Sequence, residues 1–420
     1  MRGIFSCASP DGEISIPGSK SYSQRLILLS ALFSIPVSLE NISYSEDELR
    51  AISVASQCGM SVRNSGGRCM VSGKFRSPGK LFVGESATLF RLAAGGLAGK
   101  RETVEFRLSD SLLHRNHGDL LNALASNGVH FESIPRGFLM DASAAVTGPL
   151  SITGRISSQF VSSLIVMKAS MGDFGSDVNV TNGLSSAGYV QITLDVMRKL
   201  GFEIASRTDN SFSVESFKPT DSVNVTLEGD FSSAAYFMVL AALKSAHGIT
   251  LKGLNPNSLQ PDRKMLDFLR QAGAGITTGT DYITIRESNL NGGTFEVDGC
   301  PDLALPLAVM SLFSRGKSEI TGVSRLRYKE TDRIESMIKL ARSFGASAEY
   351  SSNSVTITPP DAIRAPDVLD FMEHRSIMAG IVASIASGSR VINQNVERIS
   401  KSFPGFTGML ENVGCSIERV

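Results

Sequence analysis

The sequence predicts an α/β protein of two domains, each made of three repeated units. The chain has 420 residues, which is more than one hydrophobic core usually organises. A segment of helix, glycine and short strands recurs six times along it, and a second, uniformly apolar helix recurs with it. Recurrence at a nearly fixed spacing indicates one supersecondary unit that is repeated.

The first recurring segment is an amphipathic helix that ends at a glycine and is followed by two short strands joined by a polar turn. A helix that ends in the left-handed conformation is strained least at glycine, which has no Cβ. The alternation in "YITI" at 282–285 is typical of a half-buried strand. We assign the same plan to the closing segment "LENVGCSIERV". The six glycines lie 69 to 73 residues apart, at Gly59, Gly128, Gly201, Gly273, Gly345 and Gly414.

The second recurring helix is rich in Ala, Leu, Ser and Met on every face, which predicts that it is buried. Three units span about half of the chain, so the stretch "TLEGDFSS" around Gly229 is the expected crossover. We therefore predict an N-terminal domain of residues 18–229 and a C-terminal domain of residues 1–17 and 230–420. The six buried helices begin near Ser21, Ser86, Ser158, Ser232, Asp302 and Arg375.

Composition excludes several classes of function. Lys plus Arg and Asp plus Glu both number 41, so no overall field favours nucleic acid or an anionic membrane. No secretory signal and no membrane-spanning apolar run is recognised, which predicts a cytoplasmic protein. The five cysteines are scattered without a CxxC pair, so they predict neither a disulfide framework nor a zinc site. No repeat requires a partner, and a monomer is predicted.

Polar residues of one kind stand at the first turns of the buried helices and in nearby loops. Taken singly, each has a simpler explanation, since a serine there is more often an N-cap and a lone cation is usually solvated. Their recurrence at one phase of the repeat favours a common site, because parallel helices bring their anion-attracting N-termini together. The helix residues are Lys20, Ser21, Arg25, Thr88, Arg91, Ser157, Ser158, Gln159, Asp302, His374 and Arg375, and the loop residues are Arg115, Ser186, Tyr189, Lys329, Glu330, Arg333 and Lys401.

These residues predict a site for small, multiply anionic molecules. Arginine clamps carboxylate and phosphate in bidentate fashion, and serine hydroxyls with helix N–H groups complete a phosphate nest. Asp302 and Glu330 are the candidates for acid–base work inside this cationic field. Nearby cations lower carboxylate pKa values and keep both groups ionised unless burial opposes this. Eight cations are too many to bury without anions: Lys20, Arg25, Arg91, Arg115, Lys329, Arg333, Arg375 and Lys401.

The chain resembles the 5-enolpyruvylshikimate-3-phosphate synthase family over nearly its whole length. The resemblance is carried by "PGSKSYSQR", "SSQF", "EGDFSSAAYF", "KETDR", "EHR" and "KSFPGF", which occur in the family's order. It implies two domains of three βαβαββ units, with buried parallel helices pointing at an interdomain cleft, an inside-out α/β barrel. It also implies transfer of the enolpyruvyl group of phosphoenolpyruvate to the 5-hydroxyl of shikimate 3-phosphate, with release of phosphate and with no metal or organic cofactor.

The resemblance also implies roles for individual residues. Asp302 would take the proton of the attacking hydroxyl, and Glu330 or Lys401 would handle the proton at the methylene carbon. The residues implied for shikimate 3-phosphate are Lys20, Ser21, Arg25, Ser157, Ser158, Gln159, Ser186, Tyr189, Asp302 and Lys329. Those implied for phosphoenolpyruvate are Lys20, Ala87, Arg91, Arg115, Gln159, Arg333, Arg375 and Lys401. Lys20 and Gln159 would touch both substrates, and Lys20 is counted with Asp302, Glu330 and Lys401 as catalytic.

Four positions depart from the family pattern. Ala87 replaces a glycine, so its methyl group is expected to narrow the phosphoenolpyruvate pocket and to weaken inhibition by glyphosate, which fills that pocket but is longer. Glu85, where Asn is usual, adds a negative charge beside an anion site. Asn116 stands where proline is usual, and Glu373 replaces an aspartate. The changes at Asn116 and Glu373 are expected to affect function only slightly, because the neighbouring arginines remain.

Two other functions stay open at this point. One is the sister enolpyruvyl transferase acting on UDP-N-acetylglucosamine, which typically carries a reactive cysteine in a mobile loop. The corresponding segment here, residues 109–119, contains no cysteine. The other is a non-catalytic paralogue that binds anions, and the changes at Glu85 and Ala87 are compatible with such a function. Retention of Asp302, Glu330, Lys329 and Lys401 together favours catalytic activity.

Overall fold

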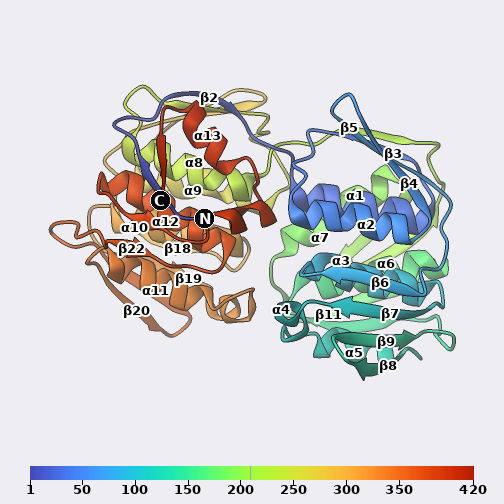
Figure 1. The fold of residues 1–420 in the computed structure, drawn as a ribbon. Helices are drawn as coiled ribbons and strands as arrows, with labels where there is room; N and C mark the ends of the chain where they lie inside the picture. The colour runs from blue at the N-terminus through green and yellow to red at the C-terminus, as the bar shows by residue number, and fades with distance from the viewer. Residues whose placement is uncertain (209) are drawn as a thin grey trace. The chain divides into compact units, whose positions relative to one another are not determined.

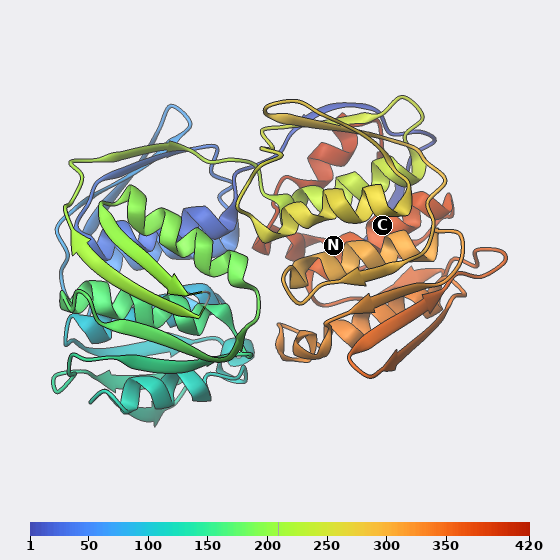
Figure 2. The same cartoon turned by 180° about the vertical axis from the view of Figure 1, so that it is seen from behind.

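The computed structural model describes residues 1–208 and 210–420, and the chain divides into two compact units (Figures 1 and 2). One, here called the N-terminal unit, is Gly18–Leu227. The other, the C-terminal unit, consists of Met1–Pro17 and Glu228–Val420. Both chain ends lie in the C-terminal unit, where the Val420 N–H donates a hydrogen bond of 3.2 Å to the Arg2 carbonyl.

The N-terminal unit contains three four-stranded sheets, with strand orders β14-β3-β5-β4, β6-β7-β9-β8 and β10-β11-β13-β12. In each, two neighbouring strands are parallel and the remaining pairs are antiparallel. The strands are β3 (Val37–Glu40), β4 (Met60–Ser65), β5 (Arg68–Gly73), β6 (Lys80–Gly84), β7 (Thr103–Leu108), β8 (His130–Ile134), β9 (Gly137–Asp141), β10 (Leu150–Gly154), β11 (Asp177–Leu184), β12 (Phe202–Thr208), β13 (Ser211–Phe217) and β14 (Val223–Thr226).

Three of the N-terminal unit's helices, α1, α3 and α6, are buried on nearly every face. Two glycines let α3 pack tightly on α6. A Cβ on Gly95 would lie 2.1 Å from the Ser163 carbonyl oxygen, and one on Gly99 would lie 2.3 Å from that of Met167. Both contacts advance by four residues, so the two helices run parallel. The helices are α1 (Lys20–Phe33), α2 (Glu46–Gln57), α3 (Ala87–Gly99), α4 (Asp110–Leu113), α5 (Gly118–Ala125), α6 (Ser158–Met171) and α7 (Ala187–Lys199).

The C-terminal unit repeats this plan with sheets ordered β22-β23-β1-β24, β16-β17-β15-β2 and β18-β19-β21-β20. Its strands are β1 (Gly3–Ser6), β2 (Gly12–Ser15), β15 (Ile249–Lys252), β16 (Gly275–Thr278), β17 (Tyr282–Arg286), β18 (Thr294–Glu296), β19 (Ser318–Thr321), β20 (Ser347–Ser351), β21 (Ser354–Thr358), β22 (Val368–Leu369), β23 (Ile392–Asn393) and β24 (Ser416–Arg419). Its α-helices are α8 (Phe231–Lys244), α9 (Met265–Ala272), α10 (Ala304–Leu312), α11 (Arg333–Ser343), α12 (His374–Ser387) and α13 (Phe406–Asn412). Its 3₁₀ turns are η1 (Pro261–Lys264), η2 (Pro301–Leu303), η3 (Ser324–Tyr328) and η4 (Val396–Lys401).

The repeat predicted from the sequence is confirmed in its helices and glycines. All six recurring glycines have φ between 81° and 99°, the left-handed region in which a Cβ causes strain. The buried helices α1, α3, α6, α8, α10 and α12 begin within two residues of the predicted starts. The six open sheets around these helices give the α/β architecture that the sequence predicts.

The prediction for the sixth segment is wrong in one respect. The chain after Gly414 forms a single strand, β24, rather than two. Its partner is β1 at the other end of the chain, which pairs with it antiparallel from Gly3 opposite Arg419 to Ser6 opposite Ser416. The sequence pattern could not reveal this, because the alternation within one strand does not identify a partner more than 400 residues away.

Candidate active site

The N-termini of the three buried helices in the N-terminal unit lie side by side. Ser86 caps α3 by accepting a 3.4 Å hydrogen bond from the Leu89 N–H, and its hydroxyl lies 3.4 Å from the side-chain oxygen of Gln24 on α1. Gln159, in the first turn of α6, donates from Nε2 to the Thr88 hydroxyl at 2.8 Å. The predicted convergence of polar first turns is thus present within this unit, where helix N–H groups and their partial positive charge attract anions.

Arg91 joins α3 to α6 at this point. Its guanidinium donates to the Ser157 hydroxyl at 3.2 Å, to Gln159 Oε1 at 2.8 Å and to the Asn116 carbonyl at 3.0 Å. Its Cζ also lies 4.8 Å from the centre of the Phe160 ring. These three hydrogen bonds end on uncharged oxygens and hold the guanidinium in place.

Arg25 is 1% exposed and bridges α1 to α7. It donates to the Thr193 hydroxyl at 2.8 Å, to the Ser21 carbonyl at 2.8 Å and to the Tyr189 carbonyl at 3.4 Å. Burial lowers the pKa of Arg25 to about 10, against the opposing effect of Tyr189 and Tyr22. The side chain therefore keeps its charge at neutral pH.

Lys20 is the first residue of α1, and its ammonium group lies 2.7 Å from the Asp47 carboxylate. Ser158 and Ala87 begin α6 and α3 and are both buried, while Ser186 is the N-cap of α7 with φ of 56°. Arg115 is half-buried. The pKa of His117 is lowered to about 4, mainly by burial and then by the charges of Arg91 and Arg115, so both cations interact electrostatically with that imidazole.

The C-terminal unit gathers its predicted residues around one carboxylate, that of Asp302. One oxygen of Asp302 lies 2.7 Å from Arg333, and the other lies 2.7 Å from Arg375. Both arginines are at least 95% buried. Burial of Asp302 raises its pKa, but Arg375, Arg333 and Lys329 together outweigh this and hold the pKa well below the usual range. Asp302 is therefore an ionised acceptor clamped by two cations.

Glu330, Lys401 and Lys329 lie beside this clamp. Glu330 is 3.5 Å from Arg333 and 3.9 Å from the ammonium of Lys401. The pKa of Lys329 is lowered to about 8, mainly by burial. Asp302 opposes this shift, and the charges of Arg333 and Arg325 contribute to it. Lys329 is thus a cation that loses its charge at a much lower pH than an ordinary lysine.

Two acidic residues complete the cluster without having been predicted as part of it. Glu373 caps α12 by accepting from the Ser376 N–H at 2.9 Å, and its other oxygen lies 3.4 Å from Arg333. Asp262 is 2% exposed and accepts a hydrogen bond from the Ser232 hydroxyl. Burial, and then the charge of Asp302, raises the pKa of Asp262. Asp262 stands at neither recurring phase of the repeat, so no sequence pattern marked it.

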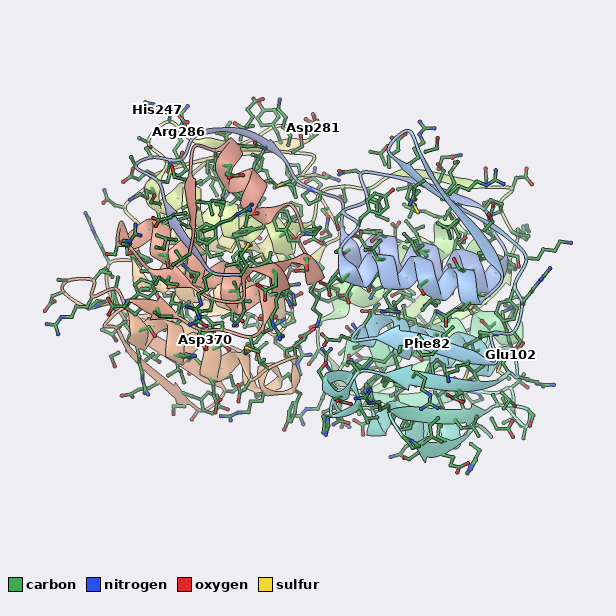
Figure 3. All side chains as sticks on the ribbon, in the orientation of Figure 1. Phe82, Glu102, His247, Asp281, Arg286 and Asp370 are labelled. Carbon is green, nitrogen blue, oxygen red and sulfur yellow. The ribbon has the colours of Figure 1, made fainter. Side chains whose placement is uncertain are left out.

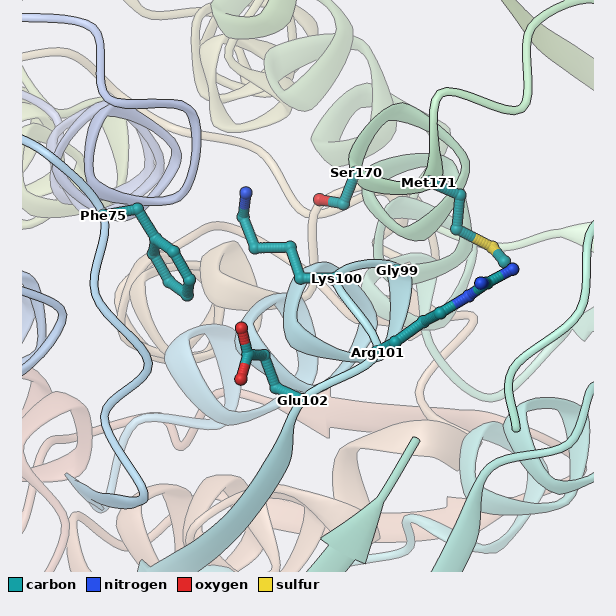
Figure 4. Close-up of a pocket in the computed structure, with 7 residues that line it drawn as sticks. All are labelled: Phe75, Gly99, Lys100, Arg101, Glu102, Ser170 and Met171. Carbon is teal, nitrogen blue, oxygen red and sulfur yellow. The ribbon is translucent and has the colours of Figure 1, made fainter. Parts of the chain in front are cut away.

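A cavity of about 450 Å³ lies at the opposite end of α3 and α6 (Figure 4). The Lys100 side chain extends between Phe75 and Ser170, with its ammonium 4.5 Å from the centre of the Phe75 ring. Because this cavity lies at the helix C-termini, it contains none of the predicted site residues. Among residues 1–208 and 210–420, no group of three or more His, Cys, Asp or Glu side chains is arranged to hold a metal ion. No helix in the same residues has the length and apolar character needed to span a bilayer.

Solved structures identify the fold. An EPSP synthase from Acinetobacter baumannii aligns over 100% of this chain and 99% of its own with a TM-score of 0.78 at 20% identity. The enolpyruvyl transferase NikO from Streptomyces tendae aligns over 99% of this chain and 98% of its own, also with a TM-score of 0.78, at 15% identity. The fold is that of the enolpyruvyl transferases.

Sequence comparison then specifies the family. The family model of EPSP synthase, 3-phosphoshikimate 1-carboxyvinyltransferase, matches residues 8–410. A 3-phosphoshikimate 1-carboxyvinyltransferase of Picrophilus torridus is 34% identical over 96% of both chains, and one of Thermoplasma volcanium is 33% identical over 94% of both. This chain belongs to the EPSP synthase family, which is a family of transferases.

Proposed function

We propose that this protein transfers the enolpyruvyl group of phosphoenolpyruvate to the 5-hydroxyl of shikimate 3-phosphate and releases phosphate. The observation that carries the proposal is the Asp302 carboxylate, held between Arg333 and Arg375 at 2.7 Å each and directly before the buried helix α10. Such a group accepts a proton from a hydroxyl once a substrate brings that hydroxyl within hydrogen-bond reach.

Substrate binding itself makes Asp302 a better base. A carboxylate paired with two guanidinium groups has a low pKa and therefore little tendency to take a proton. When the carboxylate and phosphate of phosphoenolpyruvate bind Arg333 and Arg375, their negative charge offsets the field of these cations. The pKa of Asp302 then rises, so proton abstraction becomes favourable only when the second substrate is present.

The N-terminal unit supplies anion capture. Arg25, Lys20 and the serines at the helix N-termini bind the phosphate and hydroxyl groups of shikimate 3-phosphate, while Arg91, Arg115 and Gln159 take part in binding phosphoenolpyruvate. Arg91 is held by hydrogen bonds to uncharged oxygens of Ser157, Gln159 and Asn116, and a guanidinium fixed in this way can clamp a carboxylate or a phosphate. Fixing two reactants side by side is worth as much as about 7–11 kcal/mol of the barrier.

The methylene carbon of phosphoenolpyruvate must gain a proton before C2 becomes electrophilic, and the resulting methyl group must lose one as phosphate leaves, which re-forms the double bond. Glu330 and Lys401 are the two donors in question, and the 3.9 Å between Glu330 Oε1 and Lys401 Nζ lets a proton pass from one to the other through a small side-chain movement. We keep both as candidates, with Arg333 stabilising the negative charge on Glu330 after it has given up its proton.

The proposal has a structural counterpart. We propose that the two units are domains that close on the two substrates, since the anions draw cationic residues of both domains toward them. Residues 18–229 and residues 1–17 with 230–420 are the domain limits that we propose. The enzyme is proposed to act as a cytoplasmic monomer.

The test is phosphate release from purified protein. Protein given shikimate 3-phosphate and phosphoenolpyruvate together is expected to release phosphate, and omission of either substrate is expected to abolish release. Asp302→Ala should fold and still lose release. Release from phosphoenolpyruvate alone at the same rate, or none with both substrates present, would contradict the proposed transfer. In the second case, binding of either anion would favour the non-catalytic paralogue.

A further inference from the structure

A second cavity of the N-terminal unit has a strongly cationic rim. It has a volume of about 400 Å³, which lies within the range of pockets for small organic ligands. Arg50 from α2, Lys80 from β6, Arg107 from β7 and Arg136 from the turn between β8 and β9 all line it. None of the candidate active-site residues is among its lining residues.

The cations of this rim are only partly balanced. Glu105 pairs with both Lys80, at 3.0 Å, and Arg107, while Asp110 lies 3.6 Å from the exposed Arg136. Arg50 forms no hydrogen bond or ion pair with any residue in 1–208 or 210–420. Four cations thus line the cavity, and the two carboxylates of Glu105 and Asp110 pair with three of them, which favours an anionic ligand such as a phosphate monoester.

The backbone makes room for Arg50 at the cavity wall. Gly84 ends β6 with φ of 61°, and a Cβ placed there would lie 3.0 Å from Arg50 Nε. Glycine therefore lets the guanidinium of Arg50, which lines the cavity, lie close to the backbone at this point. Ser109, which also lines the cavity, is tied to the same point by a 3.0 Å hydrogen bond from its N–H to the Gly84 carbonyl.

An apolar surface adjoins these charges. The side chain of Phe82 is 48% exposed, although an aromatic ring of this size is usually covered. Figure 3 labels it on the N-terminal unit, on the strand that also carries Lys80. The Lys80 ammonium lies 5.2 Å from the ring centre, and Leu108 completes the apolar part of the lining. A flat exposed ring among arginines favours a ligand with a planar group next to its anionic group.

We propose that this cavity, defined by Arg50, Lys80, Phe82, Arg107, Leu108 and Arg136, binds a phosphate monoester that carries a planar apolar group. Arg50 and Arg136 bind the phosphate oxygens, because Arg50 has no competing partner and Asp110 pairs with Arg136 only loosely. The planar group lies against Phe82. A nucleoside monophosphate is the simplest molecule of this class.

The test is calorimetric titration of the full chain with AMP, with inorganic phosphate and adenosine as separate arms. Wild type is expected to bind AMP more tightly than phosphate and to bind adenosine weakly. Arg50→Gln/Arg136→Gln should weaken AMP binding by at least about tenfold, since two charge-assisted contacts are lost. The matched control is Arg63→Gln/Lys199→Gln, which removes two cations of the same unit that do not line the cavity and should leave AMP binding unchanged.

A further variant tests the planar half of the ligand. Phe82→Ser should reduce the preference for AMP over phosphate without changing phosphate affinity. Equal AMP affinity in wild type and in Arg50→Gln/Arg136→Gln would overturn the proposal, because any binding would then belong to another site. Equal loss in the matched control would overturn it as well. Phosphate release from the two substrates, measured on the same samples, separates failure of this site from failure of the proposed transferase activity.

Discussion

The two units hold their arginines in opposite ways. In the N-terminal unit, Arg25 and Arg91 donate to hydroxyl, amide and carbonyl oxygens of Thr193, Gln159 and Asn116. In the C-terminal unit, Arg333 and Arg375 are paired with the Asp302 carboxylate at 2.7 Å each. Burial accordingly lowers the pKa of Arg25. The pKa of Arg375 is raised instead, because the charges of Asp302, Tyr236 and Glu373 together outweigh the opposing effect of burial.

From this difference we infer that the two units divide the binding of anionic substrates from proton transfer. A guanidinium held by neutral acceptors presents its charge to an incoming anion at once. A guanidinium held by a carboxylate must exchange that partner for substrate, and the exchange changes the basicity of the carboxylate. The N-terminal unit is therefore expected to govern affinity, and the C-terminal unit is expected to govern both affinity and proton transfer.

Apart from substitution of Asp302 itself, the largest effect is expected from Arg375→Gln in the C-terminal unit, which is compared with Arg91→Gln in the N-terminal unit. Arg375→Gln should lower kcat/KM by about 10²–10³-fold, the loss typical of one preorganised donor. It should also move the acid limb of the kcat profile upward, since Asp302 in the substrate complex loses a cation that lowers its pKa. Arg91→Gln should raise KM for phosphoenolpyruvate while leaving the acid limb in place. Steady-state kinetics from pH 5 to 9 measure the KM for phosphoenolpyruvate and the position of the acid limb. An equal shift of the acid limb in Arg375→Gln and Arg91→Gln would contradict the difference proposed between the two units.

Arg25→Gln should raise KM for shikimate 3-phosphate by about 30-fold, which corresponds to about 2 kcal/mol for a charged hydrogen-bonding group. Arg25→Lys keeps the charge but loses the fork that reaches Thr193 and Ser21 together, so its KM should fall between wild type and Arg25→Gln. Initial rates at saturating phosphoenolpyruvate provide the measurement. Equal KM values for shikimate 3-phosphate in wild type and Arg25→Gln would show that Arg25 does not bind this substrate.

Ala87→Gly tests whether the methyl group of Ala87 limits the size of the phosphoenolpyruvate pocket. Ala87 is buried at the first turn of α3, where its methyl group is expected to exclude a ligand longer than phosphoenolpyruvate. Its removal should tighten inhibition by glyphosate by about tenfold, within the 1–3 kcal/mol usual for relief of steric crowding. Competition kinetics against phosphoenolpyruvate measure this. Tight inhibition of the wild type, or no gain in the variant, would show that Ala87 does not limit the pocket.

The smallest effect is expected from Lys329. Its pKa in the substrate-free enzyme is about 8, so it is charged below this pH and neutral above it. Affinity for an anion should therefore fall as pH rises through 8, which appears as a fall of up to about tenfold in kcat/KM for shikimate 3-phosphate between pH 7 and 9. Lys329→Arg stays charged and should remove this limb. A limb of unchanged position in that variant would assign the titration to another group.

The sequence predicts the repeats well because each rests on a local physical requirement. Gly59 and its five counterparts are required by the left-handed helix end, and the apolar faces of α3 and α8 are required by burial. Pairing across long sequence separations could not be predicted in this way. β1 pairs with β24, and β14 pairs with β3 in parallel across more than 180 residues. Tertiary packing determines these partners, and the local sequence pattern carries no information about it.

The candidate site shows the same limit. Repeat phase predicted Arg91, Gln159, Asp302 and Arg375, which stand at helix starts that recur. It did not predict Asp262, which lies in the 3₁₀ turn η1 and interacts electrostatically with Asp302. Nor did it predict that Glu373 both caps α12 and pairs with Arg333. Such partnerships depend on which side chains the folded units bring into contact.

The central claim is that Asp302 moves the proton while the arginines around it bind phosphoenolpyruvate. Asp302→Asn keeps the shape of the side chain and removes its charge, so it separates these two roles. Single-turnover product formation and calorimetric binding of phosphoenolpyruvate, both with shikimate 3-phosphate present, are the measurement to make. Product formation should fall by about 10²–10⁴-fold, while phosphoenolpyruvate binds as tightly as before or more tightly because a competing carboxylate is gone. Product formation near the wild-type rate, or a parallel loss of binding, would contradict the claim.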